Sequence, residues 1–265
     1  MRRHLLVFGA LLAAFFGTGA WVAPSAAQIP IADAREQGPG ATVTVEGTVT
    51  RAFGVFVRCQ DESGPTGASG LVVRQTSGEF RDSVQSGAIA QGTQLEVSGT
   101  LSEFNGLLQI NESDLDSYTV QGKGTVPAPQ DVDVATIRSD GELYESELVR
   151  VTGVNFLTTQ GPFSTGTSYP VTDGSGSDTF AEGVVTFRVQ GSGETMIADE
   201  AIPPGSAMYT GVVGEFRSQY QLIPVQPSDI QPVTSFGFGR SFAQAAEGSG
   251  TVEVNVTAFA TESGD

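Results

Sequence analysis

The sequence predicts an all-β protein whose main part is two small barrels in tandem. Apolar and polar residues alternate in short runs at 41–50, 93–101, 183–189 and 251–259, and Gly is very frequent, with 34 residues. Short alternating runs bounded by Gly, Ser, Asn and Asp are typical of half-buried strands. Their regular spacing favours barrels or sandwiches.

The N-terminus has the pattern of a secretory signal peptide. A cationic Met-Arg-Arg start is followed by an apolar run over 5–23, and Ser25 and Ala27 provide small residues before a cleavage point. We therefore expect residues 1–27 to be removed and the protein to be secreted or held at the cell surface, with no membrane span. The alternative is a retained anchor, but no basic stop-transfer flank follows the apolar run.

Cleavage changes the composition in a way that excludes several kinds of site. Arg2, Arg3 and the only His, His4, leave with the signal peptide, so 11 basic and 30 acidic residues remain, a net charge of −19. Without histidine, Ser-His-Asp triads and His-containing zinc sites are excluded. The single Cys59 permits no intrachain disulfide, and we expect it to be a small buried hydrophobe.

The expected surface is strongly acidic and has only one lysine, Lys123. Acid-rich, lysine-poor surfaces resemble those of halophilic proteins, in which concentrated salt screens self-repulsion. An ordinary acidic secreted protein is the alternative. Carboxylates near turns could in principle do acid–base work, but at this acidity solvated surface is the better interpretation. We therefore expect no catalytic residues and no enzyme activity.

The chain contains an internal repeat. Three pairs of like residues are each separated by 112 positions, a spacing that we call the repeat offset: Asp61 and Asp173, Gly99 and Gly211, Glu103 and Glu215. Such a constant offset indicates a duplicated unit. Each unit reads as three strands, a less regular or helical segment, and two further strands. That is the order of a five-stranded Greek-key barrel of the oligonucleotide/oligosaccharide-binding (OB) type.

The predicted organisation follows from the repeat and from composition. Short helices are expected within 77–90 and 133–149, and a Gly- and Pro-rich stretch at 120–133 marks the joint between the units. The residues after Val233 are long enough for only two or three strands, which is too little for an independent sandwich. The alternative is that they form a pair of strands packed on the second barrel. The expected segments are a signal peptide at 1–27, barrels at 28–121 and 141–232, a linker at 122–140, and a partial β segment at 233–265.

Several of these stretches resemble a known family. "VTVEGTVT" at 43–50, the turn at Asp61, and "VSGTLSEFNGLLQI" at 97–110 resemble the OB-fold domain attached to secreted bacterial nucleases of the endonuclease/exonuclease/phosphatase superfamily. Residues 142–233 look like a divergent second copy, and 241–257 is similar to the opening strands of a Calx-β sandwich. The nuclease domain itself is absent. The resemblance therefore implies an accessory domain.

OB barrels bind ligands on the faces of strands two and three and through the loops joining strands one–two and four–five. Alternation along "VFVRCQ" at 55–60 and "LVVRQ" at 71–75 separates two faces. The residues expected to point inward are Val55, Val57, Cys59, Leu71 and Val73. Those expected to point outward are Phe56, Arg58, Gln60, Val72 and Arg74. With the four–five loop, the candidate ligand-binding residues are Phe56, Arg58, Arg74, Phe104 and Asn105.

These residues suggest single-stranded nucleic acid or another extracellular polymer as the ligand, because stacking plus cationic contact is how OB folds hold single strands. The acidic surface opposes nucleic-acid binding, because basic groups are needed to neutralise the phosphates. The second unit offers only Arg188 as an outward cation. The alternative is a structural spacer or adhesion module of a larger surface protein, with Phe56 and the arginines packed on a neighbouring domain.

No cofactor is expected. Ca²⁺ is possible at the acidic turns near 61–64, 112–116 and 172–178, with ordinary Asp-initiated turns as the alternative.

Overall fold

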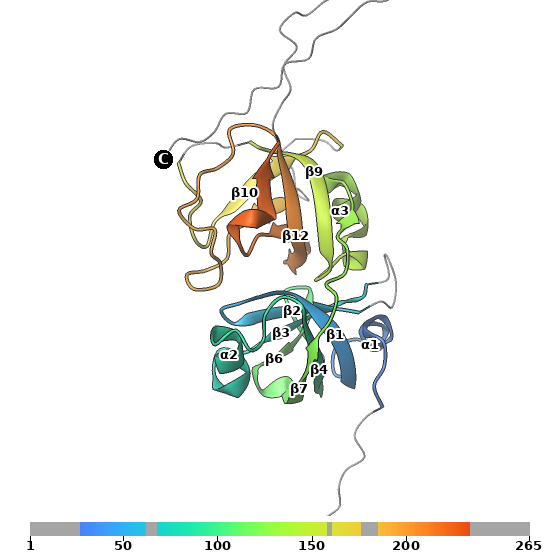
Figure 1. The fold of residues 1–265 in the computed structure, drawn as a ribbon. Coiled ribbons are helices and arrows are strands. Elements are labelled where there is room, and N and C mark those ends of the chain that lie inside the picture. Colours follow the sequence, from blue (N-terminus) through green and yellow to red (C-terminus); the bar gives the residue numbers. More distant parts are fainter. Residues whose placement is uncertain (1–26, 62–67, 158–160, 176–184, 234–265) are drawn as a thin grey trace, which may run out of the picture.

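A computed structural model describes residues 27–61, 68–157, 161–175 and 185–233. Over these residues the chain forms two β barrels stacked one on the other, accompanied by three short α-helices (Figure 1). The all-β prediction is confirmed. The predicted signal peptide, apart from Ala27, and the predicted C-terminal segment, apart from Val233, lie outside the described residues.

The first barrel has the strand order of an OB fold. β1 pairs antiparallel with β2 and with β4, and β2 pairs antiparallel with β3. β3 then pairs in parallel with β6, which is antiparallel to β5. Because β5 follows β4 after only Leu101, this chain of pairings closes into a barrel, and β7 lies along β4. The strands are β1 (Thr42–Phe53), β2 (Phe56–Gln60), β3 (Gly70–Arg74), β4 (Thr93–Thr100), β5 (Ser102–Phe104), β6 (Leu107–Asn111) and β7 (Leu115–Lys123).

The second barrel repeats the same pairings. β9 pairs antiparallel with β10 and β12, β10 with β11, and β12 with β13, whereas β11 pairs in parallel with β13. β14 lies along β12, and β8 runs parallel to β9. The strands are β8 (Gln130–Asp131), β9 (Leu148–Phe156), β10 (Ser168–Thr172), β11 (Thr186–Arg188), β12 (Ala207–Phe216), β13 (Gln219–Ile223) and β14 (Ile230–Pro232).

The repeat offset holds in three dimensions. β10 begins and ends one repeat offset beyond β2, and β13 is related to β6 in the same way. The parallel pairing that closes each barrel joins Val73 to Ile110 in the first and Phe187 to Leu222 in the second. Because Leu222 also lies one repeat offset beyond Ile110, equivalent strands occupy equivalent places in the two barrels.

Both predicted helices are present, and a third was not predicted. α2 (Gly78–Gln85) lies within 77–90, and α3 (Val134–Asp140) with the 3₁₀ turn η2 (Gly141–Leu143) lies within 133–149. The unpredicted α1 (Ile31–Gln37) precedes the first barrel, and the remaining 3₁₀ turns are η1 (Glu112–Asp114) and η3 (Pro227–Asp229). The predicted linker at 122–140 is therefore shorter than expected: β7 continues to Lys123, and α3 buries Val134 and Ile137 in the second core.

The repeated aspartates have a structural role. The backbone N–H of Ile31, the first residue of α1, donates to Asp61 at 2.6 Å, and that of Val134, the first residue of α3, donates to Asp173 at 2.9 Å. Each carboxylate satisfies an N–H that the helix leaves without a partner and lies at the positive end of the helix dipole. The turn after the second strand therefore anchors a helix in both units.

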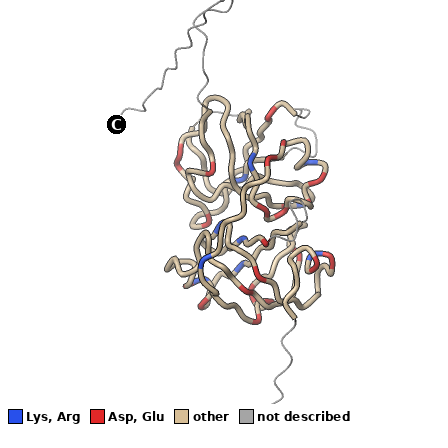
Figure 2. Tube along the Cα trace, turned by 45° about the vertical axis from the view of Figure 1, so that its right-hand side comes forward, with Lys and Arg blue, Asp and Glu red and all other residues tan. Residues whose placement is uncertain are grey.

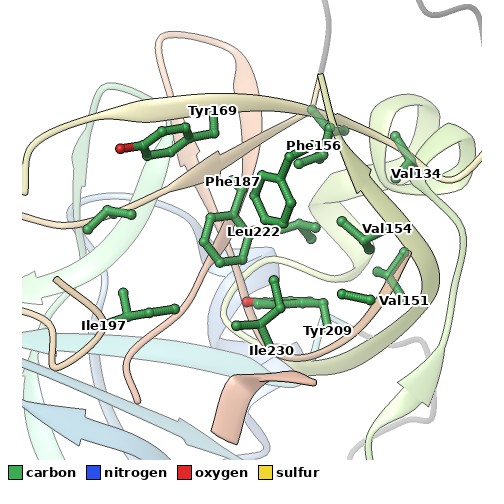
Figure 3. Packing of buried hydrophobic residues seen from close by; sticks show 14 of the residues in the cluster. Val134, Val151, Val154, Phe156, Tyr169, Phe187, Ile197, Tyr209, Leu222 and Ile230 are labelled. Carbon is green, nitrogen blue, oxygen red and sulfur yellow. The ribbon is translucent and has the colours of Figure 1, made fainter. Parts of the chain in front are cut away.

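Each barrel has its own core. In the second, Phe156, Phe187 and Tyr209 stack edge to face, with ring centroids 5.0 Å and 5.8 Å apart (Figure 3). The buried Tyr209 hydroxyl donates to the Val212 carbonyl at 2.8 Å. The first core takes aliphatic residues and Cys59 from the inner faces of its strands. Two complete cores show that each barrel buries its apolar face by itself.

Buried polar contacts join the two barrels. Arg51 of β1 reaches Asp229 of η3 at 2.6 Å, and both side chains are almost fully buried. Arg35 of α1 contacts Glu145 at 3.0 Å. Gly70 approaches the second barrel so closely that a Cβ there would lie 2.5 Å from the Ser146 carbonyl carbon. The barrels are thus held in one arrangement by charged groups and by close backbone contact.

Candidate ligand-binding cleft between the barrels

The predicted binding face of the first barrel faces the second barrel rather than open solvent. Arg58 is 1% exposed and Gln60 is 4% exposed. The Gln60 side-chain oxygen accepts a hydrogen bond from the Leu148 backbone at 3.0 Å. The alternation predicted their outward direction correctly, because neither belongs to the first core. The second barrel covers them, as the neighbouring-domain alternative expected.

The inward positions agree with prediction in all but one case. Val57, Cys59, Leu71 and Val73 are fully buried in the first core. Val55 is the exception, because it lies in the turn between β1 and β2 and is partly exposed. Burial raises the pKa of the Cys59 thiol to about 12. It is therefore a protonated core side chain and a poor nucleophile at neutral pH.

A cleft of about 480 Å³ lies between the two barrels and brings four of the five candidate residues together. We call it the inter-barrel cleft. Asn105 is the exception: it does not line the cleft, and its backbone carbonyl accepts a hydrogen bond from the Arg217 N–H at 2.7 Å. The lining residues used below are Phe56, Arg58, Arg74, Phe104 and Gln109 of the first barrel, and Ser168, Arg188, Glu215, Phe216 and Gln221 of the second.

Equivalent positions of the two barrels line this cleft from opposite sides. Arg74 pairs across the strands with Phe56, and Arg188 pairs in the same way with Ser168, which lies one repeat offset beyond Phe56. The same offset relates Phe216 to Phe104 and Gln221 to Gln109. The duplicated barrels therefore present their predicted binding faces to one another, and the site is shared between them.

Phe56 lies at the centre of a cationic group. The guanidinium carbons of Arg58 and Arg74 are 5.3 Å and 5.7 Å from its ring centroid, within the range of cation–π attraction. Arg74 also forms an ion pair with Glu112 at 2.7 Å and keeps 31% of its side chain exposed. Arg188 donates to the Gly166 carbonyl at 2.5 Å on the opposite side. Arginine side chains thus line both sides of the cleft.

Two aromatic rings form the outer edge of the cleft. Phe104 is 58% exposed and Phe216 is 38% exposed. Their ring centroids lie 6.5 Å apart, and Arg217 lies over the Phe216 ring at 5.1 Å. Exposed aromatic rings give a planar ligand a face on which to stack.

Charge is distributed unevenly over the molecule. Several Lys and Arg positions lie where the two barrels meet, whereas Asp and Glu are spread over both barrels (Figure 2). Of the 13 basic residues in the chain, Arg58, Arg74 and Arg188 line the cleft. Glu215 is the acidic residue that lines it. The cleft therefore has a local positive charge on a protein that is acidic overall.

An acidic cluster lies beside the contact between the barrels. Carboxylate oxygens of Glu142, Glu145 and Glu215 all lie within 4.8 Å of one another, a spacing that could hold a metal ion. The guanidinium of Arg35 already contacts Glu142 at 2.5 Å and Glu145 at 3.0 Å. Arg35 thus supplies a positive charge to this cluster.

Glu145 makes stability depend on pH. Burial, which Arg35 only partly offsets, raises its pKa from 4.5 to about 7. The folded protein therefore binds a proton at Glu145 more tightly than the unfolded chain. The contribution of Glu145 to the free energy of unfolding is therefore greatest below pH 4.5 and falls as the pH rises through 7. At 1.36 kcal/mol per pKa unit, the loss is at most about 3 kcal/mol.

We expect Glu145→Gln to flatten this dependence, because the amide keeps the shape of the side chain and cannot ionise. Urea unfolding at pH 5, 6, 7 and 8 measures the effect. Glu46→Gln, at a carboxylate outside the contact between the barrels, is the control. A Glu145→Gln protein that lost stability between pH 5 and 8 as steeply as the unsubstituted protein would contradict the assignment.

Sequence reasoning missed the contribution of the second barrel, apart from Arg188. Phe216 and Gln221 could have been found by adding the repeat offset to Phe104 and Gln109. Their role in the cleft could not have been found in this way, because the offset gives equivalent positions but does not place one barrel on the other.

Among the described residues, no helix is both long and apolar enough to cross a membrane.

Comparisons with known proteins add little. No family model matches the chain, and no curated protein matches it. A solved structure of a protein described as an aspartyl-tRNA synthetase from Leishmania major Friedlin shares 10% identity with a TM-score of 0.30, and the match covers 49% of this chain and 30% of that one. The chain thus matches less than a third of that protein's length, and similarity this weak carries no argument about function.

Proposed function

We propose that the protein is a secreted, non-catalytic binding module that holds a short segment of single-stranded nucleic acid in the inter-barrel cleft. One observation carries the proposal. Phe56, Arg58, Arg74 and Phe104, chosen from the sequence as an OB ligand face, line one cleft together with the equivalent face of the second barrel. Aromatic rings that stack on bases and guanidinium groups that contact phosphates are the usual combination for this ligand.

The acidic surface limits the length of nucleic acid that can bind well. A long strand would leave the cleft and run over carboxylates, which repel phosphates. A segment of a few nucleotides would meet mainly Arg58, Arg74 and Arg188. We therefore expect affinity to gain little from lengthening the strand beyond the cleft. The resemblance of 43–50 and 97–110 to nuclease-associated OB domains supports a role as an accessory to an extracellular nuclease.

Fluorescence anisotropy with labelled single-stranded oligonucleotides of three to twelve bases tests the proposal. Phe104→Ala is expected to weaken binding by about 5- to 150-fold, because stacking on one base is worth about 1–3 kcal/mol. Since Phe104 is exposed, its loss should change stability little. Arg150→Ala is the matched control, because Arg150 pairs with the exposed Asp131 outside the cleft. Binding that survived Phe104→Ala as well as it survived Arg150→Ala would refute the site.

A second function is favoured by the contact between the barrels. The buried Arg51–Asp229 ion pair and the close approach at Gly70 fix one arrangement of the two units. A rigid two-barrel unit also suits a spacer or adhesion module of a cell-surface protein. Absence of oligonucleotide binding at any salt concentration, with or without Ca²⁺, would make this the better account.

A further inference from the structure

We infer that the inner end of the inter-barrel cleft is an anion subsite formed by Arg58, and that it takes a terminal phosphate of a nucleotide or short strand. The nucleic-acid part of this ligand rests on the proposed function. The anion subsite itself rests on the surroundings of Arg58.

Arg58 is a buried cation without a counter-charge in contact. Its side chain is 1% exposed, and its Nε and Nη2 atoms are buried with no hydrogen-bond partner among the described residues. Within that part of the chain no carboxylate lies within 4.0 Å of its guanidinium. The carboxylates of Glu145 and Glu194 act on its charge from beyond that distance, while the guanidinium lies beside the Phe56 ring and lines the cleft.

The other two buried arginines at the contact between the barrels differ from Arg58, because each forms an ion pair. Arg51 has Asp229 at 2.6 Å, and Arg35 has Glu142 at 2.5 Å and Glu145 at 3.0 Å. Both therefore have the carboxylate partner that a buried charge ordinarily requires. Of these three, Arg58 alone lines the inter-barrel cleft, which is the arrangement expected of a guanidinium whose partner is a ligand.

The missing partner is best supplied by an anion. Burial lowers the pKa of Arg58 only to about 10, so it carries its charge at neutral pH. A planar guanidinium with several free N–H donors matches the oxygens of a phosphate, to which it can donate two parallel hydrogen bonds. An anion entering the cleft would satisfy both the charge and the buried donors.

A gradient of exposure along the cleft favours a terminal phosphate over an internal one. Phe104 at the outer edge is 58% exposed, the Arg74 side chain is 31% exposed, and Arg58 is 1% exposed. An internal phosphodiester has chain on both sides and would need an entry and an exit beside Arg58. A terminal phosphate needs only one path, with its base left near Phe104 and Phe216. The cleft, at about 480 Å³, falls within the usual size of small-ligand sites.

The test compares matched ligands by calorimetric titration of the purified protein. The ligands are inorganic phosphate, thymidine with and without a 5′-phosphate, and a thymidine trinucleotide carrying a 5′-phosphate, a 3′-phosphate or neither. A terminal phosphate is expected to tighten trinucleotide binding at least tenfold. Arg58→Met should abolish this difference, and Arg150→Met should preserve it. Arg58→Gln serves if the methionine variant does not fold.

The outcomes separate the subsite from the proposed function. If all trinucleotides bind alike in the unsubstituted protein, nucleic-acid binding stands and the phosphate subsite is refuted. If the trinucleotides fail to bind but thymidine 5′-phosphate or inorganic phosphate binds in an Arg58-dependent way, the anion subsite stands and the proposed function fails. If no ligand binds, or if Arg58→Met leaves the phosphate preference intact, the subsite is refuted.

Discussion

Asp229→Ala is expected to lower the free energy of unfolding by about 3–5 kcal/mol, because it leaves a buried charge without its partner. Asp229 is 1% exposed and accepts hydrogen bonds from Arg51 Nε at 3.0 Å and Nη2 at 2.6 Å. Its other oxygen accepts from the Val225 backbone at 2.8 Å. The substitution therefore removes a link between the barrels and also a contact that shapes η3.

Urea unfolding followed by circular dichroism measures this effect. Asp131→Ala is the matched control, because it breaks the Arg150–Asp131 pair, whose side chains are 37% and 76% exposed. Exposed pairs contribute about 0–1 kcal/mol. If the barrels depend on the buried pair for their contact, Asp229→Ala should also split unfolding into two transitions. Equal, small losses in the two variants would show that the Arg51–Asp229 pair does not hold the barrels together.

The strands and the duplication were predictable because both depend on local pattern. Alternation along 55–60 correctly assigned Val57 and Cys59 to the core and Arg58 to the other face. The repeat offset correctly matched β2 with β10 and β6 with β13. These features need only the period of a strand and a comparison of the chain with itself.

The contact between the barrels was not predictable from such patterns. Alternation assigns Arg58 and Gln60 to the outer face of the strand, and a strand looks the same whether water or a second domain covers that face. The partners also lie far apart in sequence: Arg51 meets Asp229, 178 residues away. The helix α1 was missed because seven residues make barely two turns and show almost no apolar period.

The acidic turns illustrate how a correct observation can have more than one physical meaning. Carboxylates at Asp61 and Asp173 suggested either Ca²⁺ ligands or ordinary turns. Both accept a backbone N–H from the first residue of a helix, α1 or α3. Asp173 also accepts the Ser175 backbone N–H at 2.9 Å, as in an ordinary Asp-initiated turn. Their repetition at a fixed offset reflects a helix anchored to each barrel, a relation that the turn sequence does not reveal by itself.

Arg58→Met is expected to stabilise the ligand-free protein while weakening its binding of phosphate-bearing ligands. A thioether chain of similar length would fill the space beside Phe56 without a buried charge, and exchanging buried charged groups for apolar ones of similar volume can gain about 1–4 kcal/mol. For a protein of this size that corresponds to a rise in melting temperature of about 2–4 °C per kcal/mol. The opposite signs of these two effects are the mark of a residue kept for ligand binding.

Thermal unfolding of the unsubstituted and Arg58→Met proteins, in phosphate-free buffer and then with thymidine 5′-phosphate, decides between two roles for this arginine. If Arg58 serves a ligand, the variant melts higher without ligand, and only the unsubstituted protein gains stability from the nucleotide, as expected when a ligand binds the folded state. Gln109→Met, at another polar residue lining the cleft, controls for the effect of added apolar volume. If Arg58→Met melts lower in phosphate-free buffer, the guanidinium is a structural part of the contact between the barrels, because its removal then costs more in lost packing than it relieves in buried charge.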